Sequence, residues 1–316
     1  MTKRIFIDGA AGTTGLEIRE RLASRKDLRV VQLTESDRKD RDARSRALND
    51  ADIVILCLPD DAAREAAGLI TNPDVRVIDA STAHRVAPGW AFGFPEYEPG
   101  NYDVIAAARR VTNPGCYATG FLALVRPLVL AGLIPSDAPL SANAVSGYSG
   151  GGKAMIEEFE KKDSPAYVET VVRTYALSLA HKHVPEMTER GGLKHPPVFA
   201  PSVGRYYRGM IVEVPLQLWS LSTAPGANML RDALAGAYAG RPFVEVAGAA
   251  ETGDLKTVDA EMLKNTNKLK IYVFGNDRTR QARLVAVLDN LGKGASGAAV
   301  QNLNIMLGLP ESTGLL

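Results

Sequence analysis

The sequence predicts an α/β fold, in which a Rossmann-type doubly wound parallel sheet is followed by an α+β domain with a mainly antiparallel sheet. Two observations predict it. Up to about residue 80, short and continuously apolar strands alternate with helical segments, which is typical of a parallel sheet covered on both faces. After about residue 112, the strand candidates lengthen and alternate between apolar and polar residues, which favours an antiparallel sheet with one wet face.

The first part of the chain supplies the parallel sheet. Its clearest strand is wholly apolar and stops at Pro59, a residue that cannot continue a central strand. Helices are indicated by apolar residues at helical spacing, such as Leu16 and Leu22. We therefore expect strands at 5–7, 30–33, 53–58 and 75–78, and helices at 15–23 and 60–70.

The second part begins with a Pro-Gly turn at 113–115 and contains a Ser-Gly-rich loop at 146–153. We expect helices at 117–131, 153–162 and 293–308, and strands at 212–218, 270–274 and 282–288. This organisation predicts a first domain of residues 1–112, to which a helix within 290–316 returns, and a second domain of residues 113–289 for catalysis and dimerisation.

Composition excludes several classes of protein. The 316 residues hold 37 Lys and Arg against 36 Asp and Glu, so we expect no nucleic-acid partner. The longest apolar stretch, 121–134, is interrupted by Arg126 and Pro127, and the first residues lack a signal-peptide layout. With only two cysteines, we expect a cytoplasmic protein that has no disulfide framework and does not act at a membrane.

A glycine-rich loop joins the first strand to the first helix. Glycines let the backbone turn tightly and approach a pyrophosphate, which the N–H groups at the start of a helix can bind. The spacing is G-x-x-G-x-x-G, so these glycines could instead serve only a tight turn. We favour a dinucleotide site formed by Gly9, Gly12, Thr13, Thr14 and Gly15.

The segment after the second strand should lie near the adenosine ribose. Ser36 and Arg38 could hold a 2′-phosphate, whereas Glu35 and Asp37 argue for NAD or for a solvated charged loop. The balance slightly favours NADP(H).

Cys116 is expected at the start of a helix, directly after the Pro-Gly turn. That position stabilises a thiolate and lowers the pKa of the thiol, and the same N–H groups can hold an oxyanion. A small apolar residue that begins a buried helix is the alternative. Cys57 lies between Leu56 and Leu58 in a strand, where burial should keep its thiol protonated and inert.

Two histidines, His181 and His183, are two residues apart and could supply a base for Cys116. They could also bind a metal or lie in a surface loop. No third metal ligand stands out, so we expect no metal.

These motifs together resemble the N-acetyl-γ-glutamyl-phosphate reductases, in particular their shorter class, over nearly the whole chain. The landmarks are the glycine loop, Asp79-Ala80-Ser81 with Arg85, Asn113-Pro114-Gly115-Cys116-Tyr117-Ala118-Thr119, Val145-Ser146-Gly147, His181-Lys182-His183-Val184-Pro185-Glu186 and Asp289-Asn290-Leu291-Gly292-Lys293-Gly294. The family reduces an acyl phosphate with NADPH in arginine biosynthesis; its relatives include aspartate-semialdehyde dehydrogenases.

The resemblance implies roles for several residues. Cys116 matches the family's nucleophile, and His181 matches its acid/base residue, with His183 as the alternative for that role. By the same resemblance, Asn290 and Gly294 lie beside the cofactor. The resemblance also implies a small-molecule acyl phosphate as substrate.

The leaving phosphate needs cations and dipoles, although each arginine could equally form a surface ion pair. The Gly-rich loop could bind an anion through its backbone N–H groups. We select Arg109, Ser146, Gly147, Gly150, His183 and Arg208 as substrate contacts, with Arg85, Arg110 and Arg205 as further candidates.

Two alternative functions stay open. The same chemistry could act on an aspartyl or aminoadipyl phosphate, or the chain could be a non-catalytic NADP-binding redox sensor, which would leave the histidine motif unexplained. Because large antiparallel sheets often pair across subunits, we expect a homodimer or a homotetramer.

Overall fold

The computed structural model describes residues 2–315 and divides them between two compact units. Unit 1 comprises Met1–Pro95, Gly100–Pro114 and Ala295–Leu316; unit 2 comprises Glu96–Pro99 and Gly115–Gly294. The chain therefore passes into unit 2 after Pro114 rather than after residue 112, and it leaves unit 2 after Gly294 rather than at 290. The short segment Glu96–Pro99 also belongs to unit 2, which no sequence pattern indicates.

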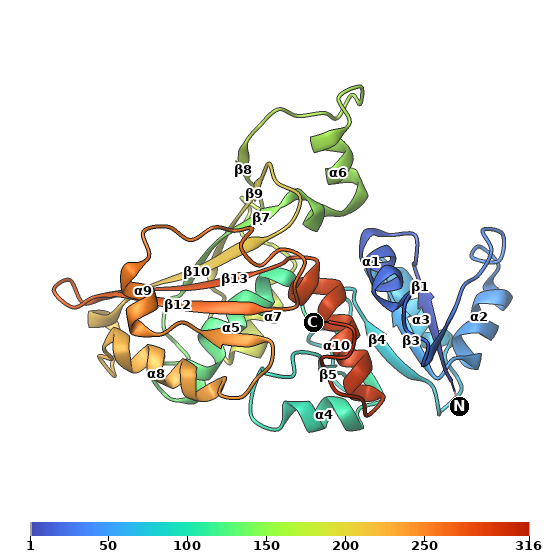
Figure 1. Ribbon diagram of the computed structural model, residues 1–316, viewed down its shortest axis with the longest axis horizontal. Coiled ribbons are helices and arrows are strands. Elements are labelled where there is room, and N and C mark those ends of the chain that lie inside the picture. Colours follow the sequence, from blue (N-terminus) through green and yellow to red (C-terminus); the bar gives the residue numbers. More distant parts are fainter. Residues whose placement is uncertain (1, 316) are drawn as a thin grey trace. The chain divides into compact units, whose positions relative to one another are not determined.

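Unit 1 is built on a six-stranded sheet in which every strand pair is parallel (Figure 1). The strand order is β2-β1-β3-β4-β6-β5, so the chain winds outward in both directions from β1 and β3. This order confirms the doubly wound parallel sheet. The strands are β1 (Lys3–Asp8), β2 (Leu28–Val31), β3 (Ile53–Leu56), β4 (Arg76–Asp79), β5 (Ala91–Phe92) and β6 (Arg110–Thr112).

Helices cover both faces of this sheet. On one face, Leu48 of α2 and Ala66 of α3 pack with the strand residues Phe6 and Val54 in one apolar core. The terminal helix α10 packs against α1 and α4 within the same unit. The helices of unit 1 are α1 (Thr13–Leu22), α2 (Arg41–Asp50), α3 (Asp60–Leu69), α4 (Asn101–Ala107) and α10 (Gly297–Met306).

Unit 2 is built on a seven-stranded mixed sheet with the order β11-β12-β13-β10-β7-β9-β8. Only β11 with β12 and β7 with β9 pair in parallel, so the expectation of a mainly antiparallel sheet is confirmed. The strands are β7 (Ser141–Gly147), β8 (Val172–Thr174), β9 (Val198–Gly204), β10 (Met210–Gln217), β11 (Val244–Val246), β12 (Leu269–Asn276) and β13 (Gln281–Leu288).

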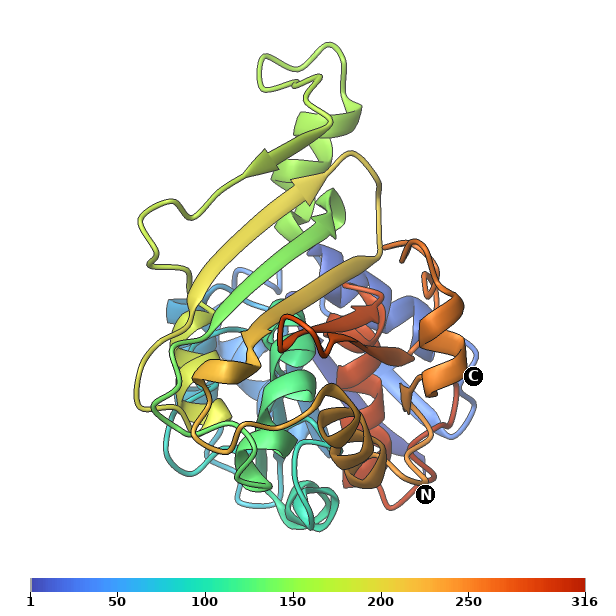
Figure 2. The ribbon, with the colours of Figure 1, turned by 90° about the vertical axis from the view of Figure 1, so that its left-hand side faces the viewer.

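The long helix α5 (Cys116–Leu130) packs on one face of this sheet, against β10 and β13. Gly120 permits this approach, because a Cβ there would lie 2.7 Å from a methyl carbon of Val212. In Figure 2, β7 and β9 extend toward α6 and β8. The remaining helices are η1 (Tyr148–Gly151), α6 (Gly152–Glu160), α7 (Val184–Gly191), η2 (Leu218–Ser220), α8 (Ala227–Ala237), α9 (Ala249–Asp254) and the π-helix η3 (Gly292–Ser296).

Within residues 2–315, none of the helices combines the length and the apolar character that a membrane span requires. The same residues contain no cluster of three His, Cys, Asp or Glu side chains that could bind a metal ion.

Candidate active site

The glycine loop of unit 1 lies at the carboxyl end of β1, where parallel sheets bind ligands. Gly9 has a φ of +89°, and a Cβ there would lie 2.2 Å from the carbonyl oxygen of Cys57. A Cβ on Gly15 would lie 2.5 Å from the carbonyl oxygen of Gly9. Helix α1 begins at Thr13, earlier than the expected residue 15, so Thr13, Thr14 and Gly15 form its first turn.

This helix start is suited to an anion. The N-cap residue Gly12 supplies no side-chain cap, and the first turn of α1 carries no acidic residue. The hydroxyl oxygen of Thr13 is buried and has no hydrogen-bond partner among the described residues. Free N–H groups and an unpartnered hydroxyl at a helix N-terminus fit the pyrophosphate of a dinucleotide.

The loop after β2 is organised around Thr34. Its hydroxyl lies 2.9 Å from the Ser36 hydroxyl and donates to the Asp37 carboxylate at 2.7 Å. Asp37 is thereby engaged within the loop, whereas the exposed Arg38 side chain forms no ion pair with any described residue. The loop thus offers the Ser36 hydroxyl and the guanidinium of Arg38, which has no ion-pair partner among the described residues.

Cys116 is the first residue of α5 in unit 2, and it is partly exposed. The N-cap residue Gly115 has no side chain, and the first turn of α5 carries no acidic residue. The first N–H groups of α5 thus lack a side-chain cap from Gly115, and N–H groups at such a helix start can stabilise a thiolate or an oxyanion. A Cβ on Gly294 would lie 2.8 Å from the Cys116 Cβ, so the backbone at Gly294 packs directly on the thiol residue.

Cys57 lies in a different environment. It follows β3, which ends at Leu56, so its predicted place inside the strand is wrong by one residue. Burial raises the pKa of its thiol to about 12, with the nearby carboxylates Asp79 and Asp8 as further causes. Its thiol therefore stays protonated near neutral pH.

Two tyrosines lie beside the thiol. The Tyr175 hydroxyl donates to the Tyr117 hydroxyl at 3.1 Å, and the Tyr117 hydroxyl donates to the Ser202 carbonyl at 3.3 Å. Burial raises the pKa of Tyr175 to about 12 and the pKa of Tyr117 well above its ordinary value, and charge on Cys116 adds to both shifts. Both hydroxyls are therefore neutral hydrogen-bonding groups at neutral pH.

The two histidines lie against these tyrosines. The His181 ring centroid lies 5.7 Å from that of Tyr175, 6.0 Å from that of Tyr117 and 4.7 Å from that of His183. His183 is buried and directly precedes α7, whereas His181 is half-buried. The segment forms a turn rather than an extended chain, yet both rings lie beside Tyr117, the neighbour of Cys116.

The predicted Ser-Gly loop and the Asn290 segment meet in unit 2. The Asn290 amide donates to the Ser149 hydroxyl at 3.0 Å and accepts from the Gly209 N–H at 2.8 Å. A Cβ on Gly150 would lie 3.4 Å from Ser146 Oγ and from the Asn290 amide nitrogen. The Asn290 side chain is buried, and both of its ends bind protein loops, which favours a loop-tying role over the expected cofactor contact.

Gly147 is fixed by packing. A Cβ there would lie 2.6 Å from the carbonyl oxygen of Tyr207, and its N–H donates to the Gly209 carbonyl at 2.9 Å. The absence of a side chain at Gly147 therefore makes room for backbone rather than for a substrate.

Arg109 is wrongly predicted as a substrate contact. Its guanidinium donates to the carbonyl oxygens of Val75 at 3.2 Å and Asn72 at 2.8 Å. These residues precede β4, and Arg109 itself precedes β6, so the side chain lies at the amino ends of the parallel strands. Ligands bind at the carboxyl ends of such strands.

The other arginine candidates differ in their partners. Arg205 donates to the carbonyl oxygens of Thr170, Phe159 and Val168, and Arg85 donates to those of Asn113 and Ala80, so both hold backbone segments. Arg208 lies 3.6 Å from the buried Asp289 carboxylate and donates to the Asn265 side chain at 2.7 Å. It directly precedes Gly209, which Asn290 binds.

Sequence reasoning missed two buried acids. The Glu186 carboxylate accepts the N–H of Gly115 at 2.9 Å, and Glu96 forms a fully buried ion pair with Lys293 at 2.8 Å. The sequence marks Glu186 only as part of the histidine motif, because a glutamate in the first turn of a helix is ordinary at the surface. Glu96 stands in no recognisable pattern.

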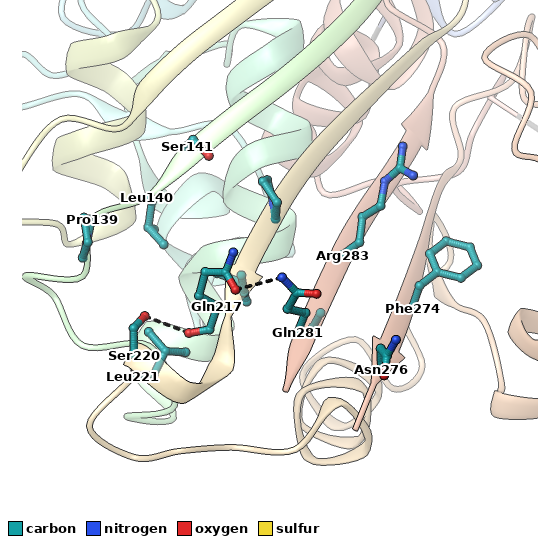
Figure 3. A pocket seen from close by; sticks show the side chains of 14 residues that line it. Pro139, Leu140, Ser141, Gln217, Ser220, Leu221, Phe274, Asn276, Gln281 and Arg283 are labelled. Carbon is teal, nitrogen blue, oxygen red and sulfur yellow. Dashed lines mark hydrogen bonds between the residues drawn. The ribbon is translucent and has the colours of Figure 1, made fainter. Parts of the chain in front are cut away.

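A pocket of about 560 Å³ lies elsewhere in unit 2, on the β10–β13–β12 part of the sheet (Figure 3). Gln217, Gln281 and Arg283 line it with Phe274, and Gln281 donates to the Gln217 side chain at 3.0 Å. Neither the thiol nor a histidine lines it, so its chemistry does not make it the candidate active site.

Comparisons with known proteins agree with this division. Residues 4–105 match the semialdehyde dehydrogenase NAD binding domain, and residues 116–290 match the semialdehyde dehydrogenase dimerisation domain. Unit 1 thus contains a domain of a family that binds a nicotinamide dinucleotide.

Curated relatives match almost the full length. The chain is 52% identical to N-acetyl-gamma-glutamyl-phosphate reductase 2 of a Nostoc species, over 99% of each chain. It is 53% identical to N-acetyl-gamma-glutamyl-phosphate reductase of Brucella anthropi, over 98% of this chain and 99% of the relative. The fold is similar to that of aspartate semialdehyde dehydrogenase II of Vibrio cholerae, with a TM-score of 0.70 at 16% identity over 98% and 99% of the chains. The chain therefore belongs to the semialdehyde dehydrogenase family, among the N-acetyl-γ-glutamyl-phosphate reductases.

Proposed function

We propose that this chain reduces N-acetyl-L-glutamyl 5-phosphate to N-acetyl-L-glutamate 5-semialdehyde and phosphate, with NADPH as the reductant, in arginine biosynthesis. The observation that carries the proposal is the position of Cys116 at the start of α5, a helix start without a side-chain cap, beside Tyr117 and Tyr175. The relatives named above bear the name of this reductase.

Cys116 is the nucleophile. Its thiolate attacks the carbonyl carbon of the acyl phosphate, and the N–H groups at the start of α5 hold the oxyanion that forms. When the oxyanion collapses, the bond to phosphate breaks and a thioester on Cys116 remains. A thioester is electrophilic enough to accept a hydride, which an ester on serine would do less readily.

A reduced nicotinamide dinucleotide, held by the Gly9–Gly15 loop and Thr13, supplies the hydride when bound. The remaining steps belong to the chain's own residues. His181, which packs against the rings of Tyr175 and Tyr117, acts as the acid/base residue at the substrate oxygen. Expulsion of the Cys116 thiolate then releases the aldehyde. His183 supports His181, and Ser146, Gly150 and Arg208 bind the substrate.

NADP(H) is favoured over NAD(H) by the loop after β2. Ser36 offers a hydroxyl, and Arg38 is a cation without an ion-pair partner among the described residues, as a 2′-phosphate requires. Thr34 binds the Asp37 carboxylate, which reduces repulsion between that carboxylate and the phosphate.

The second unit also favours self-association. Its matched domain is a dimerisation domain, and the hollowed sheet face with Phe274, Gln281 and Arg283 is our candidate for the surface that pairs with a second copy. We propose a homodimer or a homotetramer. We place the enzyme in the cytoplasm, because the chain has only two cysteines and the proposed nucleophile Cys116 must stay reduced.

The test is a phosphate-dependent oxidation assay with purified protein and three aldehydes: N-acetylglutamate, aspartate and aminoadipate semialdehydes. We expect NADP reduction with the first and at least a hundredfold lower kcat/KM with the others, since a site that binds the N-acetyl group leaves buried polar groups unpaired without it. Preferred oxidation of another aldehyde would reassign the substrate. No oxidation of any of them would favour the redox sensor.

A further inference from the structure

The peptide that carries Cys116 is fixed from both sides. The carbonyl oxygen of Gly115 accepts the N–H of Thr119 at 2.8 Å and its hydroxyl at 3.0 Å. The N–H of Gly115 donates to Glu186 Oε1 at 2.9 Å. Gly115 is the N-cap of α5 and has no side chain with which to cap the helix itself. The hydrogen bond to Glu186 therefore holds the amino side of this peptide.

Glu186 is an unusual residue for this task. It is only 1% exposed, and a carboxylate so deeply buried costs free energy unless hydrogen bonds compensate it. A neutral acceptor could also accept the Gly115 N–H, at a lower cost of desolvation. The position of this acid therefore calls for an explanation beyond stability.

Its place in the chain supplies that explanation. Glu186 lies in the first turn of α7, directly after the turn that carries His181 and His183. The N–H of His183 donates to Nδ1 of His181 at 3.1 Å, so the histidine ring is anchored to the same short segment. One six-residue segment thus holds both the imidazole and the start of the nucleophile helix.

We propose that Glu186 is a positioning residue for the reaction: its hydrogen bond to Gly115 holds the Cys116 thiol at the start of α5 in register with His181. The inference rests on the proposed role of Cys116. Loss of the bond frees the flexible glycine, and the thiol then departs from the N–H groups that stabilise its thiolate. Displacement of a reacting group by about 1 Å can lower a rate about a hundredfold.

Three variants and a control test this. Glu186→Gln keeps an oxygen that accepts the Gly115 N–H, Glu186→Leu keeps the volume without an acceptor, and Glu186→Asp keeps the charge on a shorter side chain. The control is Glu189→Gln, an exposed glutamate of the same helix. Each protein is measured for its thermal midpoint, its rate of alkylation at Cys116 by iodoacetamide with peptide mapping, its kcat and its KM.

We expect Glu186→Leu and Glu186→Asp to alkylate and turn over about a hundredfold more slowly, with KM changed less than threefold. Glu186→Gln should recover to within about fivefold of the original protein, and Glu189→Gln should match it. If Glu186 had a purely structural role, the thermal midpoint of all three Glu186 variants would fall. The alkylation rate and kcat would then not differ between Glu186→Gln and Glu186→Asp.

The inference is overturned if a folded Leu or Asp variant alkylates at the normal rate, or if a folded Gln variant is as slow as they are. Should the Leu variant fail to fold, the Gln and Asp pair still decides. Alkylation needs no substrate, so a wrong substrate assignment would abolish reductase activity in the original protein and leave this comparison intact.

Discussion

The backbone N–H of His183 donates a hydrogen bond to Nδ1 of His181 over 3.1 Å. A neutral imidazole that accepts at Nδ1 must carry its proton on Nε2. In that tautomer, Nε2 is the ring atom of His181 that donates a hydrogen bond. A doubly protonated ring would lose the bond from His183, because Nδ1 would then carry a hydrogen itself.

This relationship predicts the effect of removing the imidazole. His181→Ala should lower kcat by about 10²–10⁴, the usual contribution of a positioned acid or base, with little change in the affinity for the cofactor. His195→Ala, which removes an exposed histidine remote from the motif, is the control and should keep normal rates. Steady-state kinetics measures kcat, and a separate cofactor titration measures the affinity for the cofactor. A His181→Ala protein with near-normal kcat would remove His181 from the mechanism.

Replacement of the nucleophile should be more severe. Cys116→Ser should leave the thermal midpoint and cofactor binding unchanged and abolish nearly all turnover, because a serine hydroxyl is not ionised near neutral pH. Rapid mixing with the acyl phosphate in the absence of reductant, followed by intact-mass measurement, should detect a covalent acyl adduct in the original protein only. An adduct that peptide mapping places away from position 116 in the original protein would disprove acylation at this residue.

The buried thiol of Cys57 predicts a pH dependence of stability. Burial raises its pKa to about 12 in the folded state, against an ordinary value of ~8.5 in the unfolded chain. The folded state therefore holds the proton more tightly. The resulting stability is complete below ~8.5 and is lost as the pH rises toward 12.

Urea unfolding between pH 8 and 11 should thus show a stability that falls with pH, and less steeply in Cys57→Ala. The buried tyrosine Tyr175 has a pKa raised in the same direction, but it contributes equally to both proteins and cancels in the comparison. Parallel curves for the two proteins would show that Cys57 ionises normally in the folded state.

Much of this molecule could be predicted from sequence because its local patterns and its tertiary structure agree. The apolar run 53–58 contains β3, which ends at Leu56, and Cys116 lies at the start of α5 directly after the Pro-Gly turn, as expected. The prediction of Arg109 as a substrate contact is wrong because it rests on the closeness of Arg109 to Cys116 in the sequence, which does not imply closeness in space. The guanidinium of Arg109 instead binds carbonyl oxygens that precede β4, at the amino ends of the parallel strands of unit 1.

Contacts between distant segments could not be predicted. The bond from Glu186 to Gly115 joins residues 71 positions apart, and the pair of Glu96 with Lys293 joins residues 197 positions apart. No local periodicity reports such a pairing, because it depends on how the sheet and the helices of unit 2 bring their ends together.

The loop after β2 predicts the choice of cofactor. Arg38→Ala should raise the KM for NADPH about tenfold, which corresponds to the loss of a charge-assisted hydrogen bond worth about 1.4 kcal/mol, and leave the KM for NADH unchanged. Lys39→Ala, at the next exposed position, is the control. Equal changes with both cofactors would show that Arg38 acts on the structure of the loop and does not recognise the 2′-phosphate.

The last prediction concerns the buried pair of Lys293 and Glu96. The ammonium lies 2.9 and 2.8 Å from the two carboxylate oxygens, and neither side chain exceeds 1% exposure. Removal of one partner leaves a buried charge uncompensated, which typically costs about 3–5 kcal/mol of unfolding free energy. Lys293→Met should therefore destabilise the protein strongly in urea.

The double variant Glu96→Gln with Lys293→Met removes both charges and should recover a large part of that loss, because the cost arises from the unpaired ion rather than from the missing attraction. The exposed pair of Lys264 with Glu261, whose side chains are 54% and 40% accessible, provides the contrast: Lys264→Met should cost less than about 1 kcal/mol.

Since Lys293 directly precedes Gly294, whose backbone packs on Cys116, the single variant should also lose turnover. A Lys293→Met protein as stable as the Lys264→Met protein would show that the buried pair contributes no more to stability than an exposed one.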